Sequence, residues 1–246
     1  HVAAKAGSWG AYEDFHRTNV LGTENVLAAC RRHGIRDLVY TSSPSVVFDG
    51  GDMEGVDESA PYADHFEAHY PETKSRAERM VLAASSDALR TAALRPHLIW
   101  GPRDTNIMPR LIQRSRAGQL RRIRGPKKLV DVTYIDDAAR AHILAMDGLR
   151  AGGSSGERIA GNAYFISSGE PISLWEMIDN MLVAVGEPRI ARSVSPRAAF
   201  VGGWAFEKLH AIFRLEGEPR MTRWVAREMT TAHWFDISAA KEDFGY

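Results

Sequence analysis

Residues 18–43, TNVLGTENVLAACRRHGIRDLVYTSS, decide the fold that the sequence predicts. Apolar side chains recur at helical spacing in the first part of this stretch. They predict a helix over residues 13–33, with Gly34 where a C-terminal cap belongs. The run from Asp37 to Ser43 is short, apolar and closed by small hydroxyl residues, which is typical of a buried parallel strand. Together the two segments predict one helix–strand unit of an α/β domain.

The same alternation continues further along the chain. The pattern predicts a helix over residues 71–84 and another buried strand over residues 91–100, which Gly101 and Pro102 close. Helices and strands that alternate at this spacing predict a doubly wound parallel sheet. We therefore assign residues 1–102 to an α/β domain, and residues 103–246 mostly to a smaller C-terminal substrate lobe. Some segments of this lobe are expected to return to the sheet.

Further elements are expected within residues 103–246. Their pattern predicts helices over residues 107–117, 136–149 and 174–185, strands over 130–135 and 163–166, and a flexible turn over 152–156. Ser173 and Glu176 have the spacing of a capping box at the start of the third helix. Six aromatic residues of this part suit either an apolar pocket or the core of the lobe: Trp175, Phe200, Trp204, Phe206, Phe213 and Trp224.

The composition excludes several classes of protein. The 31 basic and 31 acidic residues of the 246-residue chain cancel, so no nucleic-acid partner is predicted. Cys30 is the one cysteine, which rules out an intrachain disulfide and fits a reducing, cytoplasmic compartment. The sequence has no run of 18 apolar residues that could span a membrane. Residues 198–213 are aromatic and amphipathic, which makes peripheral membrane association an alternative. No metal site is predicted.

A chemical site is predicted at one edge of the sheet. Ligands of open α/β sheets bind outside the carboxyl ends of the strands. Three segments are expected to end there: His1 to Lys5, Tyr40 to Ser43, and Leu94 to Pro102.

Tyr70 and Lys74 share one helix face because they are four residues apart. An ammonium group near a phenol favours the phenolate, so the pair predicts a lowered pKa for Tyr70. Such a tyrosine can exchange a proton with an alcohol oxygen, which the Ser43 hydroxyl can hold. Taken alone this spacing is a weak signal, and the flanking strand ends give it weight.

The chain resembles an extended short-chain dehydrogenase/reductase of the NAD-dependent epimerase/dehydratase superfamily. Within it, the resemblance is greatest to the 3β-hydroxysteroid dehydrogenase/isomerase branch, which includes sterol-type dehydrogenases and bacterial reductases of long-chain 2-alkyl-3-oxoalkanoates. The segments that carry it are HVAAKAGSWG, residues 18–43, YPETK, ALRPHLIWGP, VDVTYIDDAARAHILAM and HWFDISAAKEDFGY. The resemblance implies a Rossmann-type fold for the first domain and a cofactor that is NAD or NADP.

The resemblance also implies roles for individual residues. Tyr70 would be the general acid/base, and Lys74 would lower its pKa and bind the nicotinamide ribose. Ser43 is preferred to Ser42 because the family usually uses the last residue of the triplet. The residues expected at the cofactor are Val2, Ala3, Ala4, Lys5, Thr18, Tyr70, Lys74, Pro96 and Ile99.

The chain departs from the family pattern in one respect. The glycine-rich turn that cradles the pyrophosphate is absent, and with it the residue that selects NAD or NADP. The sequence therefore predicts that the chain is a fragment whose N-terminal part is missing, and that cofactor binding by the fragment is weakened.

Three functions remain open at this point. The first is an oxidoreductase that interconverts a secondary alcohol and a ketone on a lipophilic substrate, sterol-like or 2-alkyl-3-oxoalkanoate-like. The second is a nucleotide-sugar epimerase or dehydratase, for which Arg110, Arg114 and Arg116 could grip a diphosphate. The third is a non-catalytic module that senses a dinucleotide. By analogy with the family, residues 13–33 and 71–84 are expected to form the contact of a homodimer.

Overall fold

The computed structural model describes residues 1–246, apart from the side chain of Ser155. Its central layer is a sheet of three parallel strands in the order β1 (Asp37–Thr41), β3 (Arg90–Pro96) and β8 (Asn162–Ile166). The first residues of the chain lie along the other side of β1, where the Thr41 amide donates to the carbonyl of His1 over 3.0 Å. The predicted parallel sheet is confirmed.

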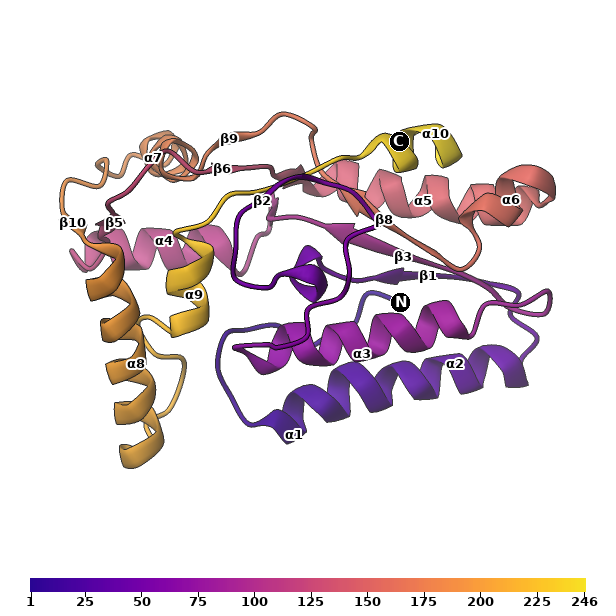
Figure 1. The fold of residues 1–246 in the computed structure, drawn as a ribbon, viewed down its shortest axis with the longest axis horizontal. Coiled ribbons are helices and arrows are strands. Elements are labelled where there is room, and N and C mark those ends of the chain that lie inside the picture. Colours follow the sequence, from indigo (N-terminus) through magenta and orange to yellow (C-terminus); the bar gives the residue numbers. More distant parts are fainter.

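Helices cover both faces of this sheet (Figure 1). One face carries α1 (Tyr12–Phe15), a π-helix (His16–Leu21), α2 (Gly22–Arg32) and α3 (His69–Ala83), and the other carries α5 (Ile135–Ala151), α6 (Gly153–Ile159) and α10 (Ser238–Phe244). Successive β1 side chains point to opposite faces. Leu38 and Tyr40 pack against α2 and α3, whereas Val39 packs against α5. This two-sided burial explains the apolar strand sequence.

The remaining elements form the second part of the molecule (Figure 1). A second sheet has the order β2 (Met53–Val56), β11 (His233–Phe235), β6 (Leu129–Val130) and β9 (Ile172–Ser173). Two short pairs join β4 (Ile99–Trp100) to β7 (Thr133–Tyr134), and β5 (Arg122–Ile123) to β10 (Ser193–Val194). The helices of this part are α4 (Ile107–Arg116), α7 (Leu174–Ala184), α8 (Pro196–Phe213) and α9 (Arg223–Glu228).

Glu207 and Gly203 of α8 fix the position of α9. The Glu207 carboxylate accepts hydrogen bonds from the backbone amide and the Nε of Arg223, each 2.7 Å long. Gly203 is buried, and a Cβ atom built on it would lie 2.8 Å from the carbonyl carbon of Thr222. The two helices therefore approach more closely at this point than any other residue would allow.

Four local predictions differ from the structure. The strand expected over 130–135 is divided, because β6 ends at Val130 and β7 holds only Thr133 and Tyr134. The turn expected over residues 152–156 is wrong, because α6 begins at Gly153. The strand expected over 91–100 is interrupted where Leu98 takes a positive φ of 41°. The capping box is also wrong: Ser173 makes no side-chain cap, because it belongs to β9, and the carbonyl of Lys128 receives the first helical amide, that of Leu174.

Candidate active site

Ser43 lies just beyond the carboxyl end of β1, where the chain turns into a 3₁₀ helix (Pro44–Val47). Its Oγ is 2.9 Å from the Oγ of Ser45 and accepts a hydrogen bond from the Ser45 amide. Ser42, in contrast, is 4% exposed, and its hydroxyl has no hydrogen-bond partner among the side chains that the structure describes. Of the two serines, Ser43 is the one that turns toward the open edge of the sheet.

Lys74 reaches back from the second turn of α3 to the same strand end. Its Nζ donates to the carbonyl of Thr41 and lies 4.1 Å from the centroid of the Tyr40 ring. The side chain is 2% exposed. Burial lowers the pKa of Lys74 to about 7, and Glu78, one turn further along α3, opposes that shift.

Tyr70 stands in the first turn of α3, with its ring 6.5 Å from that of Trp224 on α9. Burial raises the pKa of Tyr70, the Ser43 hydroxyl opposes the rise, and the charge of Glu228 adds to it. The predicted lowering of the Tyr70 pKa is therefore wrong for this structure, because burial of the phenol dominates and Lys74 is not among the groups that shift it. At neutral pH the Tyr70 phenol is a proton donor.

The N-terminal segment expected to line the cofactor runs along the same edge. Val2, Ala3 and Ala4 are exposed there, next to the strand end that carries Ser43. Pro96 is buried at the end of β3, and Ile99 is half-buried at the start of β4. The site roles assigned to all of these residues remain predictions.

Asn19 is a residue of this edge that the sequence patterns missed. Its Oδ1 accepts from the Lys5 amide over 2.7 Å, and its Nδ2 donates to the Lys5 carbonyl and to the Thr73 hydroxyl, each over 3.0 Å. Asn19 thus ties the N-terminal segment to α3, while its neighbour Thr18 is exposed. A single buried amide inside an apolar helix was the signal that could have identified it. It lies in the π-helix, a geometry common at functional sites.

The site suits the nicotinamide end of a dinucleotide. The small side chains of Ala3 and Ala4 leave their backbone open to a ligand, and the buried ammonium of Lys74 lies at the neighbouring strand end. The described residues contain no group of three His, Cys, Asp or Glu side chains that could hold a metal ion. Chemically, Tyr70 can exchange a proton with a substrate oxygen, and Ser43 can hold the same oxygen by a hydrogen bond.

An apolar cavity of about 300 Å³ lies in the second part of the molecule, between α4, α7, α8 and α9. Trp175, Phe206 and Met229 line it, and Arg114 is at its wall. Of the other predicted pocket aromatics, Trp204 and Phe213 are exposed. The aromatic residues therefore do not form one pocket, and Trp224 packs instead against the core cluster around Phe48.

The arginines considered for a diphosphate are mostly occupied. Arg110 forms an ion pair with Glu218, and Arg116 pairs with Glu187, both at 2.7–2.8 Å. Arg114 remains at the cavity wall, where burial lowers its pKa. Burial of a cation without a carboxylate of its own is compatible with an anionic or polar ligand group, but the three arginines do not form one diphosphate clamp.

The sequence has curated relatives of known activity. It is 47% identical over 248 residues to a 2-alkyl-3-oxoalkanoate reductase from Stenotrophomonas maltophilia, covering 100% of this chain and 74% of that protein. It is 37% identical over 188 residues to a human sterol-4-alpha-carboxylate 3-dehydrogenase, decarboxylating, covering 75% and 49% respectively. The chain thus spans between half and three quarters of the length of these relatives.

Solved structures share the fold. A UDP-glucuronic acid 4-epimerase from Bacillus cereus, crystallised with NAD, superposes with a TM-score of 0.70 at 20% identity, over 99% of this chain and 66% of that one. At this identity the likeness is one of fold. The Rossmann-type architecture predicted from the sequence is confirmed.

No helix among the residues that the structure describes is long and apolar enough to cross a membrane. The family model for the 3-beta hydroxysteroid dehydrogenase/isomerase family matches residues 1–194, most of the chain. Together with the relatives above, this match shows that the chain belongs to the 3-beta hydroxysteroid dehydrogenase/isomerase family.

Proposed function

We propose that the protein to which this chain belongs is an NAD(P)-dependent oxidoreductase that interconverts a ketone and a secondary alcohol on a lipophilic acid. The observation that carries the proposal is the meeting of Ser43, Tyr70 and Lys74 at the end of β1, three side chains from two separate elements. A reductase and a dehydrogenase among the relatives support the same class of reaction.

In this proposal the chain's own residues position and protonate the reacting oxygen. The Tyr70 phenol gives its proton to the carbonyl oxygen in reduction and takes it back in oxidation. Ser43 donates a hydrogen bond to the same oxygen and stabilises the charge that develops on it. Lys74, held at Thr41, binds the ribose of the nicotinamide cofactor, which supplies or accepts the hydride when bound.

The names of the relatives support a narrower substrate class. A 2-alkyl-3-oxoalkanoate carries its carboxylate next to the carbon beside the reacting ketone, and a sterol-4-carboxylate 3-dehydrogenase acts next to the carbon that bears the carboxylate. The common element is a 3-oxo or 3-hydroxy acid with a large apolar remainder. We infer that this chain takes such a β-oxo acid, and that the cavity beside α9 receives part of its apolar portion.

The alternatives have less support. A nucleotide-sugar epimerase would need a diphosphate site, and Arg110 and Arg116 are engaged with Glu218 and Glu187. A dinucleotide sensor would not require Ser43, Tyr70 and Lys74 together at the end of β1. Turnover measurements separate these functions from the proposed one.

The test is a spectrophotometric assay of the full-length gene product. Reduction of a 2-alkyl-3-oxo acid, or oxidation of the 3-hydroxy acid, is followed through nicotinamide absorbance with NAD(H) and NADP(H). Replacing Tyr70 by Phe removes the proton donor and is expected to lower kcat by about 10²- to 10⁴-fold. Tyr246→Phe, which deletes a hydroxyl bonded to the Ser167 carbonyl, is the matched control and is expected to keep full activity. Conversion of a sugar nucleotide without net cofactor change would contradict the proposal.

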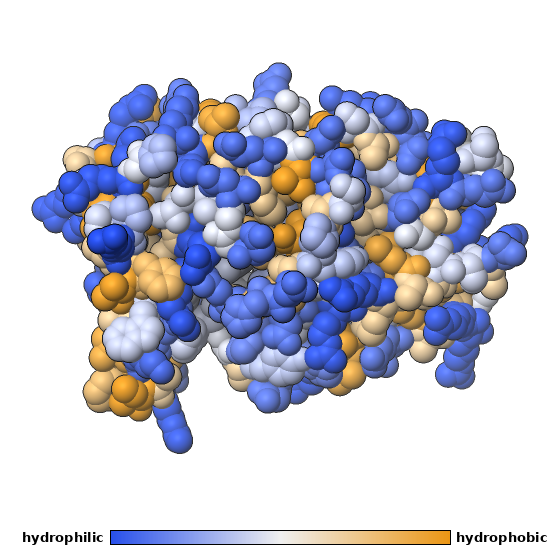
Figure 2. All heavy atoms as spheres, in the orientation of Figure 1, coloured by the Kyte–Doolittle hydropathy of each residue, from blue (hydrophilic) through white to orange (hydrophobic). Residues whose placement is uncertain are grey.

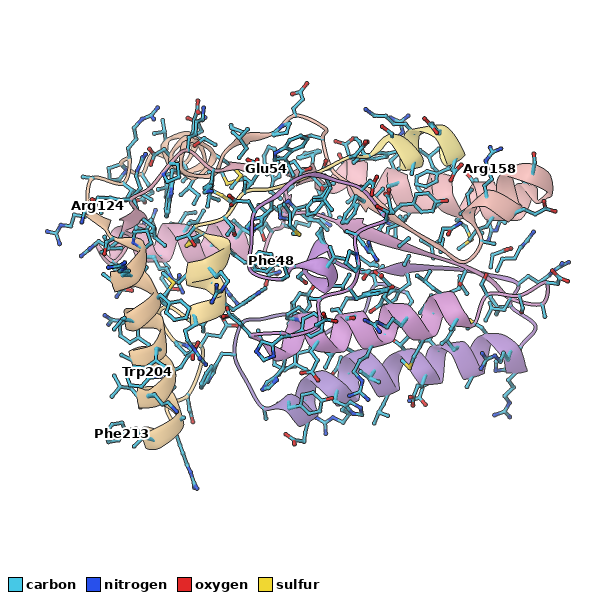
Figure 3. All side chains as sticks on the ribbon, viewed as in Figure 1. Phe48, Glu54, Arg124, Arg158, Trp204 and Phe213 are labelled. Atoms are coloured by element: carbon cyan, nitrogen blue, oxygen red, sulfur yellow. The ribbon has the colours of Figure 1, made fainter. Side chains whose placement is uncertain are left out.

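Two predicted partners also belong to the proposal. Peripheral membrane contact is supported by the exposed apolar side chains on α8, of which Trp204 and Phe213 mark the outer face (Figure 3), and Figure 2 shows apolar colour at the free end of this helix. Lys208 and Arg214 lie within the same stretch, and cations favour anionic lipids. The homodimer expected through the helices of residues 13–33 and 71–84 stays a prediction, which the mass of the full-length protein in solution would test.

A further inference from the structure

Helix α9 brings an acidic side chain up to Tyr70 that the family resemblance did not assign. Trp224 and Glu228 are four residues apart on α9, so they share one face of the helix. That face is turned to α3, because the Trp224 ring lies 6.5 Å from the Tyr70 ring, and ionised Glu228 acts on the phenol. The opposite side of the helix, through Ala226, packs on Ala199 of α8.

Neither polar group on this face has a protein partner. The Trp224 Nε1 is buried and makes no hydrogen bond, and the Glu228 carboxyl forms no hydrogen bond or ion pair with any side chain that the structure describes. The two arginines of α9 do not compensate, since Arg223 binds Glu207 and Arg227 binds Glu67. A buried N–H without a partner costs free energy unless a ligand completes it, and the Glu228 carboxyl on the same helix face has no protein partner that would keep it from the same ligand.

We propose that Glu228 and the Trp224 indole N–H form the subsite for the carboxylate of the substrate, next to the oxygen that Tyr70 protonates. In this subsite Glu228 is a neutral acid that donates its O–H to one carboxylate oxygen, and the indole N–H donates to the carboxylate as well. The inference rests on the proposed function, because a β-oxo or β-hydroxy acid carries its carboxylate two bonds from the reacting carbon.

The protonation of Glu228 makes the subsite selective. Burial raises its pKa to about 8, so the carboxyl is mostly neutral at pH 7 and ionises above pH 8. Of the groups on the elements packed against α9, Glu207 of α8 and Glu67 before α3 are each held by an arginine, and Tyr70 of α3 is the titratable group that faces Glu228. An ionised Glu228 would repel a substrate carboxylate and leave an uncharged ester unaffected.

The experiment compares two substrates in the full-length enzyme between pH 6.5 and 9.5. One is a 2-alkyl-3-hydroxy acid and the other is its methyl ester, both oxidised with the preferred nicotinamide cofactor. The measured quantity is the ratio of KM for the acid to KM for the ester. A change in this ratio that came from titration of Tyr70 or Lys74 would persist in Glu228→Gln, so the variant separates it from titration of Glu228.

For the wild type we expect this ratio to rise about tenfold as pH passes through 8, and for Glu228→Gln to stay flat, since glutamine remains neutral. Trp224→Phe keeps the ring, loses the N–H, and is expected to raise KM for the acid alone by about tenfold. Arg223→Gln, on the other side of α9, is the control for a general disturbance of the helix and should leave the shape of the pH profile unchanged.

The outcomes separate the two proposals. Failure of the wild type to oxidise either compound would overturn the proposed function. Oxidation of both with a ratio that is independent of pH, or a Glu228→Gln ratio that still rises, would overturn the subsite and leave the function intact. An equal loss of kcat with both compounds in Glu228→Gln would assign the residue to proton transfer instead and so also contradict the inference.

Discussion

Lys74 of α3 and Arg95 of β3 are both buried cations, at 2% and 3% exposure, yet only Arg95 has a carboxylate partner. Its guanidinium binds Glu78 through Nε and Nη2, with a shortest contact of 2.6 Å, and the Tyr62 hydroxyl donates to the same carboxylate. Lys74 has the Thr41 carbonyl and the Tyr40 ring.

The difference separates a structural charge from a chemical one. A buried ion pair with several hydrogen bonds is held in one geometry. A buried ammonium held by a carbonyl keeps donors for a ligand and has a pKa of about 7. Along α3, a fixed ion pair at Glu78 therefore lies one helical turn from a titratable lysine at the proposed active site.

Glu78→Gln would test whether the ion pair of Arg95 and Glu78 stabilises the fold. It leaves the Arg95 guanidinium buried without a counter-charge, and the free energy of unfolding is expected to fall by about 3–5 kcal/mol. Denaturant titration monitored by circular dichroism would measure it. Glu67→Gln, which loses the ion pair of partly exposed Arg227, is the matched control and should cost less than about 1 kcal/mol. Equal losses in the two variants would contradict the distinction.

Lys74→Met would test whether Lys74 is a titratable cation with a role in the reaction. In the wild type the lowered pKa means that the unfolded chain binds more protons than the folded one between pH 7 and pH 10.5, so stability rises with pH in this window. Methionine cannot titrate. The variant is therefore expected to be more stable than the wild type at pH 6.5, by at most about 5 kcal/mol at about 1.4 kcal/mol per pH unit.

The advantage of Lys74→Met should shrink toward pH 10, and kcat should fall by about 100-fold or more at every pH. Chemical denaturation at several pH values together with steady-state kinetics would test both effects. A variant that loses stability at neutral pH would assign Lys74 to the structural class with Arg95.

Asn19→Ala would test whether the N-terminal segment is held for the cofactor. The substitution removes three hydrogen bonds and leaves the Lys5 amide and carbonyl unpaired, at an expected cost of about 1–3 kcal/mol in unfolding free energy. The dissociation constant of the dinucleotide should also rise, as calorimetry would measure. Asn25→Ala, an exposed position on α2, is the control and should change stability by less than about 0.5 kcal/mol. Weakened folding with unchanged cofactor affinity would make Asn19 purely structural.

Periodicity predicted the main elements of the fold. A strand buried on both faces has a continuous apolar sequence, and a helix buried on one face has apolar residues at helical spacing. The helix over 71–84 and the strand from Asp37 were found to within a few residues, and Gly34 does take a left-handed φ of 63° at the helix end. The spacing of Tyr70 and Lys74 predicted their common face for the same local reason.

What the sequence missed depends on contacts between distant segments. The capping box at Ser173 failed because a neighbouring strand claimed that residue, which no local pattern records. Glu228 was not singled out because a glutamate in a short helix is ordinary until α9 is packed against Tyr70. The direction of the Tyr70 pKa shift was mistaken because sequence gives the nearest charge and not the depth of burial.

The close approach at Gly203 lets a residue outside the proposed carboxylate subsite control its position. The nearest backbone atoms that a side chain at position 203 would meet belong to Thr222 and Arg223, the residues from which α9 starts. A single added methyl group would therefore push α9, and Trp224 and Glu228 with it, toward or across Tyr70 without altering any group that touches substrate. Evolution or an engineer could retune the preferred acid through one remote glycine, and a search for specificity mutations should include this position.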